Sequence, residues 1–509
     1  MFKLLRSLGK SLGKAIYNDP ELQRIFRKYP RFSHFVKKRL TPDEEFGLIL
    51  TVGSLITFLF IYFFFQIVQD LIGQGALLQS DLRVLNLFQI LRTPAFNEKM
   101  LFITYLAHWQ VVFLGVLLVG ILFLLARRWH YFVTLVISVG AGEAFVWFLK
   151  LFVHRSRPPL INALVQETTY SFPSGHSFVA ISFYGLLTYF VFRAVKGKLW
   201  KFLAILPGFF LILAIGFSRI YLGAHWPSDV LASYASGASW LAVLITSLEI
   251  RRRFWPRKPV ENPIHKAWLC ALGVVFFSAW LGFVFYFFSN HPLAPSPAQV
   301  TLPETVISES QIPDVLFETL PRTSEDLKGT PMEPINIIVV GTQDRLDQAF
   351  ETAGWMLTDP ITAKSIWHMT IATILNQSYA SAPGIPSFWD TYPNDFAFEK
   401  LGDQNSVRER NHIHFWETPF SLGNEVRVWF GTAHFDQGIK LMSSVILPTH
   451  VIDPAVDEER DKVKEDLVAT GFVDHVQEFQ IVDPQLGNNE AGDLFFTDGK
   501  SVILFLDVL

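Results

Sequence analysis

The feature that most limits how this chain can fold is a series of seven apolar runs. A helix needs about 20 predominantly apolar residues to cross the hydrocarbon core of a bilayer, and it must satisfy its backbone polar groups internally. The mean hydropathy of +0.30 and the 49 phenylalanines agree with several such helices. The sequence therefore predicts a polytopic α-helical membrane bundle, with runs at roughly Phe46–Val68, Phe102–Ala126, Tyr131–Leu149, Phe178–Arg193, Trp200–Phe217, Val230–Leu248 and Ala267–Phe288.

Basic residues gather in every second loop between these runs. The first 45 residues contain eleven Lys and Arg, and cytoplasmic loops carry an excess of such residues. We therefore expect a cytoplasmic N-terminus, and an odd number of spans then exports the part that follows the seventh run. The basic residues of the later inside loops are Arg127, Arg128, Arg193, Lys196, Lys198, Lys201, Arg251, Arg252, Arg253, Arg257 and Lys258.

The first 45 residues lack the apolar core of a cleavable signal peptide. Apolar residues instead alternate with basic ones, which predicts an amphipathic helix on an anionic membrane surface. A loosely ordered basic tail that only fixes orientation needs the same charges and is the alternative. The residues concerned are Phe2, Leu5, Leu8, Leu12 and Ile16 among Lys3, Arg6, Lys10 and Lys14.

The chain changes character after the seventh run. Residues 1–300 carry 30 Lys and Arg against 13 Asp and Glu, whereas residues 301–509 carry 13 against 33, so the two parts belong to different environments. A Pro/Ser-rich stretch predicts a linker. After it, strand-like runs at 335–340, 426–430 and 502–506 alternate with helix-like runs at 344–353 and 457–468, which predicts a soluble α/β domain. The expected division is a basic segment (1–45), six spans (46–250), a cytoplasmic loop with the seventh span (251–290), the linker (291–334) and the soluble domain (335–509).

Three polar clusters lie at the ends of the runs, all on the predicted outer side. They are Lys150 to Arg157-Pro158, then Pro173-Ser174-Gly175-His176, and finally Ser218-Arg219 with His225 and Asp229. Charged residues are rare at such positions unless they are functional or face water. We therefore treat these three clusters as the candidate site.

The residue types in the clusters suit an anion. Lys150, Arg157 and Arg219 supply positive charge, and a guanidinium offers paired hydrogen bonds to phosphate oxygens, although each taken alone is typical of snorkelling to the interface. Ser174 and Gly175 precede a helix, where backbone amides bind anions and where a serine also serves as an ordinary cap.

His225 and Asp229 are four residues apart, which places them on one face of a helix start. The carboxylate then accepts from one ring nitrogen and leaves the other free for nucleophilic attack. A plain interfacial hydrogen bond is the alternative for the pair taken alone.

Together the clusters form the patterns Lys-x6-Arg-Pro, Pro-Ser-Gly-His and Ser-Arg-x5-His-x3-Asp, with no position substituted. Over about residues 45–250 the chain thus resembles the type 2 phosphatidic acid phosphatase superfamily. The resemblance implies a six-span core that hydrolyses lipid phosphates at the outer face of a bacterial inner membrane, in the periplasm or outside the cell, through a phosphohistidine. It also implies the roles of nucleophile for His225, orienting partner for Asp229 and general acid for His176. The phosphate cradle would be Lys150, Arg157, Ser174, Gly175 and Arg219, with no metal or other cofactor.

From about residue 335 to 470 the chain resembles the LssY C-terminal-domain family, which indicates little about function. Six residues there suggest metal ligands, but we expect a lid, a lipid-presenting surface or a module for an unidentified protein partner instead. Since every motif lies before residue 230, we also expect the chemistry to survive without this domain. The six residues are His412, His414, His434, Asp436, His450 and Asp453.

The expected partners are the membrane and a lipid phosphate, with no nucleic acid. Undecaprenyl pyrophosphate, phosphatidic acid, phosphatidylglycerol phosphate and lipid A phosphates all remain open as substrates. The competing interpretation is a lipid-binding, transport or secretion-associated membrane protein that uses an inactive phosphatase fold as an anchor. Inactivation usually removes a catalytic side chain, and none is missing from the three motifs.

Overall fold

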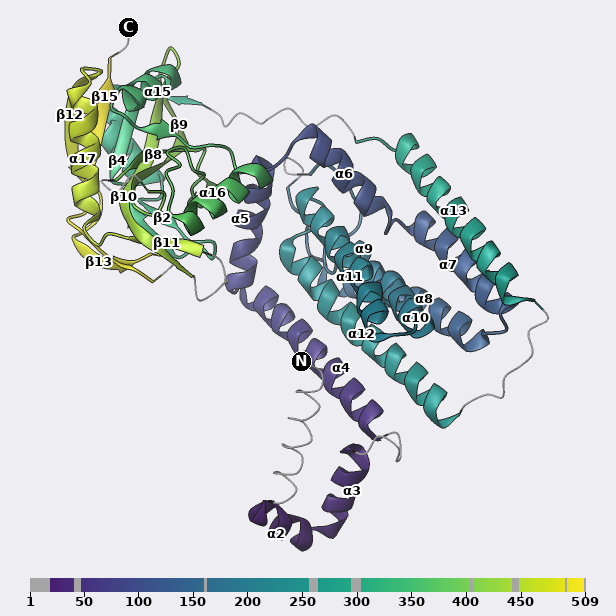
Figure 1. Cartoon of the computed structure of the whole chain (residues 1–509). Coiled ribbons are helices and arrows are strands. Elements are labelled where there is room, and N and C mark those ends of the chain that lie inside the picture. Colours follow the sequence, from purple (N-terminus) through teal and green to yellow (C-terminus); the bar gives the residue numbers. More distant parts are fainter. Residues whose placement is uncertain are drawn as a thin grey trace.

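The computed structural model describes residues 19–40, 47–159, 163–255, 264–293, 304–402, 406–441, 448–489 and 492–507. The amphipathic helix expected around Phe2–Ile16 lies outside the described residues. Two short helices, α2 (Pro20–Lys28) and α3 (Pro30–Leu40), precede the first long apolar helix. Figure 1 shows a helical bundle and a sheet-containing C-terminal domain on either side of one helix, α5 (Ala76–Ile90).

Six helical segments of the described chain are long and apolar enough to cross a membrane. They are α4 (Gly47–Gly73), α8 (Trp129–Val153), Gly175–Ala194, α11 (Lys198–Tyr221), α12 (Pro227–Phe254) and α13 (Lys266–Asn290). The remaining predicted run falls in α6 (Pro94–Tyr105) and α7 (Trp109–Leu125), which are bent by 45° and count as a seventh span if taken together. The predicted membrane bundle is therefore confirmed.

Small residues let α12 sit in the middle of the bundle. It packs against α4, α5, α8 and α11, and against the segment Gly175–Ala194, which consists of α9 (Gly175–Val179), a π-helical turn η2 (Ala180–Gly185) and α10 (Leu186–Ala194). A Cβ at Gly53 of α4 would lie 2.0 Å from Thr246 Oγ1 of α12, so no larger residue fits there. This close approach is the kind that small residues permit between membrane helices.

Helix α5 is more polar than the spans and is held at its start by the end of α4. Asp70 Oδ2 accepts hydrogen bonds from the backbone amides of Leu77, at 2.8 Å, and Leu78, at 3.2 Å. A carboxylate at this position satisfies amides that have no partner within the helix. The direction of α5 is thereby fixed relative to α4.

The C-terminal domain is built on a nine-stranded mixed sheet with the order β12-β15-β4-β10-β9-β8-β5, where β1 also pairs with β9 and β11 with β10. Only the pairs β15–β4 and β1–β9 are parallel. Helices α15 (Gln343–Thr352), α16 (Ala363–Leu375) and α17 (Val456–Ala469) accompany it. The strands are β1 (Thr305–Val306), β4 (Ile337–Gly341), β5 (Met356–Leu357), β8 (Phe396–Leu401), β9 (Arg410–Gly423), β10 (Val426–Leu441), β11 (Pro448–Ile452), β12 (Val473–Gln480) and β15 (Lys500–Leu506).

The prediction of a linker over residues 291–334 is wrong for the second half of that range. Residues 305–334 contain β1, a 3₁₀ turn, α14 (Ile312–Thr319), β2 (Thr323–Glu325) and β3 (Pro331–Pro334). Ile312 and Leu316 lie four apart on α14 and are fully buried in the core of the domain. The prolines misled the prediction because proline is tolerated in the first turn of a helix, where Pro313 lies.

A second, four-stranded sheet faces the bundle, with the order β3-β2-β6-β7. Its strands β6 (Phe388–Trp389) and β7 (Tyr392–Pro393) form a hairpin whose two tip residues, Asp390 and Thr391, have positive φ angles of 45° and 73°. Two such residues are typical of the tight turns that join antiparallel strands. Strand β7 contacts α5, so this sheet is where the domain meets the bundle. A further hairpin pairs β13 (Gln485–Asn488) with β14 (Leu494–Thr497).

Candidate active site

The three sequence motifs meet because the helix ends that carry them converge. Lys150 lies near the end of α8, which stops at His154 in the left-handed conformation. Arg219 lies in the last turn of α11, and Asp229 lies in the first turn of α12. Chain positions nearly 80 residues apart thus supply one site.

His225 lies between a carboxylate and a guanidinium. Its Nδ1 is 3.4 Å from Asp229 Oδ2, and its Nε2 is 3.3 Å from Arg157 Nη1. The side chain is 2% exposed and that of Asp229 is fully buried. Asp229 also accepts from the Ser171 hydroxyl and, at 3.1 Å, from the Trp226 amide. The carboxylate therefore favours the tautomer with the proton on Nδ1 and the lone pair on Nε2.

The surroundings also keep this imidazole neutral. Burial lowers the pKa of His225 well below its usual range, and the positive charges of Arg157 and Arg219 lower it further. Lys150 adds to this effect, whereas the carboxylate of Glu167 opposes it. A neutral ring with its lone pair directed toward a guanidinium is suited to attack a phosphorus atom held there.

The three predicted cations are each held by groups around this ring. Arg157 donates to the backbone oxygens of Thr169 and Ala224, both at 2.6 Å. Arg219, which is 1% exposed, donates to Thr104 Oγ1 at 2.8 Å. Lys150 donates to the backbone oxygen of Tyr170. The structure therefore brings Lys150, Arg157 and Arg219 together, as predicted.

The backbone amide of Ser174 is not free to bind an anion, which was its expected role. Its N–H donates to the Asp229 backbone oxygen at 3.3 Å, so that amide is already used. Its hydroxyl oxygen caps α9 by accepting from the Ser177 amide at 3.4 Å. Gly175 and His176 follow in the first turn, whose amides have no partner within the helix, and the half-buried His176 ring lies 6.3 Å from the ring of His108.

The sequence did not reveal that Arg155 binds the second carboxylate oxygen of Asp229. Arg155 donates to Asp229 Oδ1 and to Asp81 Oδ2, both at 2.6 Å. Its position inside the first motif, two residues before Arg157, was a usable signal. Asp81 gave none, because nothing in the sequence connects a carboxylate on α5 with a motif more than 70 residues away.

Glu167 is the second missed residue. Its carboxylate accepts from the Arg219 guanidinium and lies among the predicted phosphate-binding cations. Burial raises the pKa of Glu167, but the charges of Arg219 and Arg157 outweigh burial and lower it overall. Glu167 is therefore ionised, and it pairs with Arg219, one of the cations predicted to bind phosphate.

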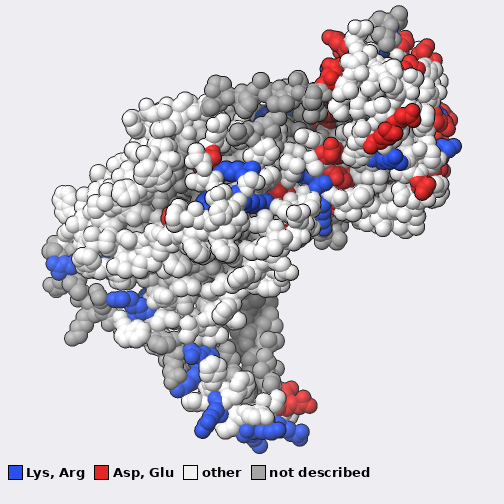
Figure 2. All heavy atoms as spheres, turned by 180° about the vertical axis from the view of Figure 1, so that it is seen from behind, with Lys and Arg blue, Asp and Glu red and all other residues white. Residues whose placement is uncertain are grey.

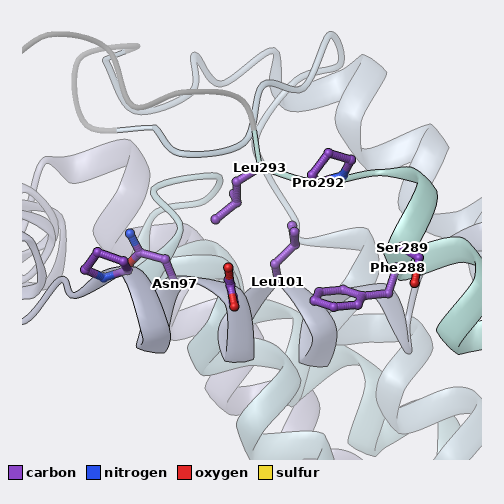
Figure 3. A pocket seen from close by; sticks show the side chains of 8 residues that line it. Asn97, Leu101, Phe288, Ser289, Pro292 and Leu293 are labelled. Atoms are coloured by element: carbon purple, nitrogen blue, oxygen red, sulfur yellow. The ribbon is translucent and has the colours of Figure 1, made fainter.

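An open cavity of about 430 Å³ lies beside the site rather than in it. Figure 3 shows it between α6 and the end of α13, with Leu101, Phe288 and Leu293 on its walls. Leu101 is one helical turn from Thr104, which holds Arg219. Asn97, Glu98 and Ser289 add polar groups to the apolar ones, so the lining of this cavity is mixed.

Three of the other polar candidates, His412, His414 and His434, lie together in the C-terminal sheet, with ring centroids 4.2–6.0 Å apart. No group of three or more His, Cys, Asp or Glu in the described residues is arranged to hold a metal ion. His412 instead contacts Glu399 at 3.0 Å and His414 at 2.9 Å inside the C-terminal sheet, while the His450 side chain is outside the described part. Glu143, a carboxylate within the third apolar run, is exposed on α8.

Comparisons with known proteins identify the families of both parts of the chain. The PAP2 superfamily matches residues 129–253 and the LssY C-terminus family matches residues 317–500. Phosphatidylglycerophosphatase B of Bacillus subtilis (strain 168) is 30% identical over 180 residues, which are 35% of this chain and 87% of that protein. Undecaprenyl-diphosphatase of Sulfolobus acidocaldarius is 31% identical over 84 residues, 16% of this chain and 36% of that protein.

Among solved structures, the transmembrane PAP2 type phosphatidylglycerolphosphate phosphatase from Bacillus subtilis is 25% identical, with a TM-score of 0.34. The match covers 40% of this chain and 98% of that chain. The LssY match starts before residue 335 and runs past residue 470, so it is longer than the resemblance in the sequence indicated. With a relative of 30% identity covered over most of its length, the chain belongs to the PAP2 superfamily of membrane phosphatases and carries an LssY-type C-terminal region.

Proposed function

We propose that this protein hydrolyses a lipid phosphate or pyrophosphate at the outer face of a bacterial inner membrane through a phosphohistidine intermediate, without a metal ion. The observation that carries the proposal is the position of His225, whose Nδ1 faces Asp229 and whose Nε2 faces Arg157. A nucleophile with an orienting carboxylate on one side and a phosphate-binding cation on the other is the arrangement that covalent phosphoryl transfer needs.

In the first step, His225 Nε2 attacks phosphorus and forms an N–P bond while the bond to the lipid oxygen breaks. His176 gives a proton to that departing oxygen, and Asp229 stabilises the positive charge on the substituted imidazole. In the second step, water attacks phosphorus, His176 takes its proton, and the N–P bond breaks. Inorganic phosphate leaves and His225 returns to its neutral form, so atoms and protons balance over the cycle.

Positive charge for the transferring group comes from the protein in this proposal. Lys150, Arg157 and Arg219 carry three charges, and fixed cations stabilise the charge that spreads over the phosphoryl oxygens. Arg219 is buried and is held by Thr104 before substrate arrives, but its second terminal nitrogen pairs with Glu167, which the phosphate has to displace.

The proposed orientation is supported by the distribution of charge over the molecule. Lys and Arg gather at the end formed by α2 and α3, whereas Asp and Glu gather over the C-terminal domain (Figure 2). A band of surface without charges lies beside the basic end in this view, and a second group of Lys and Arg lies beyond this band, next to the C-terminal domain. The basic end belongs in the cytoplasm by the positive-inside rule, which leaves the site and the acidic domain outside, in the periplasm or the extracellular space.

The names of the relatives narrow the panel of substrates to test. One is named for phosphatidylglycerophosphate and the other for undecaprenyl diphosphate. The cavity between α6 and α13 has a mixed lining that includes Glu98, so it does not distinguish the two compounds. A panel with both compounds and phosphatidic acid, tested on the detergent-solubilised protein, ranks them by kcat/KM.

The decisive experiment separates the two histidines by their dependence on the leaving group. An aryl phosphate leaves as a stable anion and needs little proton donation. His176→Ala should therefore regain part of its activity on an aryl phosphate, whereas His225→Ala should stay inactive on every substrate and form no acid-labile phosphoenzyme. A phosphorylated His225→Ala protein, or rescue of that variant by the aryl substrate, would refute these roles. If the wild-type protein releases no phosphate from any member of the panel, the non-catalytic alternative gains support instead.

A further inference from the structure

Helix α5 has two polar faces, and each carries a buried charge. Asp81 is 1% exposed and Arg83 is 6% exposed. Residues two apart on a helix point about 200° away from each other, so these two side chains leave α5 on opposite sides. Leu85 is four residues after Asp81 and Asn86 three after Arg83, and both are buried on the respective face.

The face with Asp81 supports the active site. Asp81 Oδ1 accepts from the Ser228 amide at 2.9 Å, and Oδ2 accepts from the Ser228 hydroxyl and from Arg155. The other terminal nitrogen of Arg155 donates to Asp229. Asp81 thus contacts two groups adjacent to the carboxylate that orients His225, and it touches neither the ring nor the phosphate-binding cations.

The face with Arg83 holds the C-terminal domain. Arg83 donates to both carboxylate oxygens of Glu325 on β2, at 2.9 and 2.6 Å. Glu325 also accepts from the Thr391 amide at the hairpin tip, at 2.6 Å, and the Thr391 oxygen accepts from Asn86 at 3.0 Å. Gly329 lies flat against the guanidinium, where a Cβ would come within 2.6 Å of Arg83 Nη2.

We infer that α5 couples the C-terminal domain to catalysis: docking on Arg83 and Asn86 holds α5 in the position from which Asp81 orients Arg155 and Asp229. Asp81 is then a positioning residue, and the LssY-type domain is part of the apparatus that sets the site. This inference rests on the proposed phosphatase function. It replaces the expectation from the sequence that the chemistry is independent of the domain.

Geometry makes this coupling strong. The bidentate pair between Arg83 and Glu325 fixes direction as well as distance on one side of α5. On the other side, Asp81 accepts one hydrogen bond from Arg155 and two from Ser228. Small displacements of catalytic groups are costly, since a misplacement of about 1 Å can reduce a rate about 100-fold. Breaking only the pair between Arg83 and Glu325 should displace Asp81 by less than about 1 Å. We therefore expect a loss of about tenfold in kcat.

The test uses the full-length protein in detergent and a soluble short-chain lipid phosphate. Glu325→Gln removes one charge with little change in shape, and Arg83→Glu reverses the other partner. Both should lower kcat about tenfold and leave KM within about twofold, because the phosphate-binding cations are untouched. The double variant R83E/E325R restores a pair of opposite charges and should recover at least about threefold of the lost kcat.

A matched control lies elsewhere in the same domain. Arg345 forms a bidentate pair with Asp507, at 2.6 Å for both hydrogen bonds, far from α5 in the fold. Arg345→Glu should leave kcat within about twofold of wild type. An equal loss of kcat in Arg345→Glu would indicate general destabilisation of the domain and overturn the inference.

Asp81 is tested in the same assay. Asp81→Asn should lower kcat at nearly constant KM, and Asp81→Glu should keep more of the rate than the amide because it retains the charge beside Arg155. Normal kcat in both Glu325→Gln and Arg83→Glu, or losses confined to KM, would overturn the coupling. Failure of the phosphatase proposal is distinguishable, because there the wild-type protein itself releases no phosphate or His225→Ala is as active as wild type.

Discussion

Replacing Glu167 by glutamine should tighten the binding of phosphate. In the structure Glu167 pairs with Arg219, one of the three cations that we assign to the phosphate. The carboxylate is ionised because Arg219 and Arg157 lower its pKa. A phosphate that binds to Arg219 must therefore displace an anion, whereas in Glu167→Gln it displaces only a neutral amide.

The size of the effect follows from that single contact. A hydrogen bond between charged groups contributes about 1.5–3 kcal/mol net. The Arg219 side chain is 1% exposed but that of Glu167 is 28% exposed, so solvent screening favours the lower end of this range. About 1.4 kcal/mol corresponds to a factor of ten in a binding constant. We therefore expect the inhibition constant of inorganic phosphate to fall about tenfold.

The assay is competitive inhibition by phosphate, and by vanadate, of lipid phosphate hydrolysis in detergent. Glu98→Gln is the control, since Glu98 is an exposed carboxylate on the neighbouring helix α6 and forms no ion pair with the part of the chain that the structure describes. It should leave both inhibition constants unchanged. An unchanged or weaker inhibition in Glu167→Gln would show that Glu167 does not compete with phosphate, and the reasoning would fail.

Three further predictions test other parts of the site. Alanine at Lys150, Arg157 or Arg219 should each reduce kcat/KM about 10²–10³-fold, the usual loss for one electrostatic donor, and a folded variant with near-normal activity would contradict the cradle. Arg157→Met should move the acidic limb of the kcat/KM profile to higher pH, because a charge that lowers the pKa of His225 is removed and the ring stays protonated at higher pH; a shift to lower pH would contradict this sign. A reporter that works only outside the cytoplasm should be active when fused after Pro297 and inactive after Pro256, and the reverse pattern would place the site in the cytoplasm.

Much of the site could be predicted because its residues are concentrated in three short motifs. Each motif lies next to an apolar run, so the alternation of runs and basic loops already places all three at the same end of the bundle. In the structure Lys150, Arg157, Arg219, His225 and Asp229 lie close enough to interact, whereas their roles stay predictions. The exact task of Ser174 was less accessible, because a serine before a helix serves equally as a cap or as an anion ligand.

The support around the site could not be predicted in the same way. Asp81 and Glu167 lie in segments without a motif, and a single carboxylate is compatible with many local roles. Their importance comes from tertiary contacts with Arg155 and Arg219, which no periodicity of the chain records. Arg155 was the exception, because a second arginine in a short motif is itself a signal.

In the C-terminal domain, the strongest local patterns were also the correct ones. The runs predicted as strands at 335–340, 426–430 and 502–506 and as helices at 344–353 and 457–468 all fall on elements of that type. The segment before residue 335 was misjudged from its prolines. Proline reports where a chain cannot continue a hydrogen-bonded pattern, and it does not report whether the neighbouring Ile312 and Leu316 find a core.

The position of Arg155 between two carboxylates explains why the site needs Asp81 at all. If Arg155 paired with Asp229 alone, its positive charge would largely cancel the negative charge that the proposed mechanism requires beside His225 when phosphorus becomes bonded to Nε2. Asp81 accepts from the second terminal nitrogen of Arg155, so the guanidinium is shared and the group of three retains one net negative charge. That charge faces His225 from the side opposite to the phosphate-binding cations, which is where it stabilises a positively charged imidazole without attracting those cations away from the phosphate. Asp81 lies on α5, which the pair between Arg83 and Glu325 joins to the C-terminal domain. In this position Asp81 keeps Asp229 both oriented and effective as an anion.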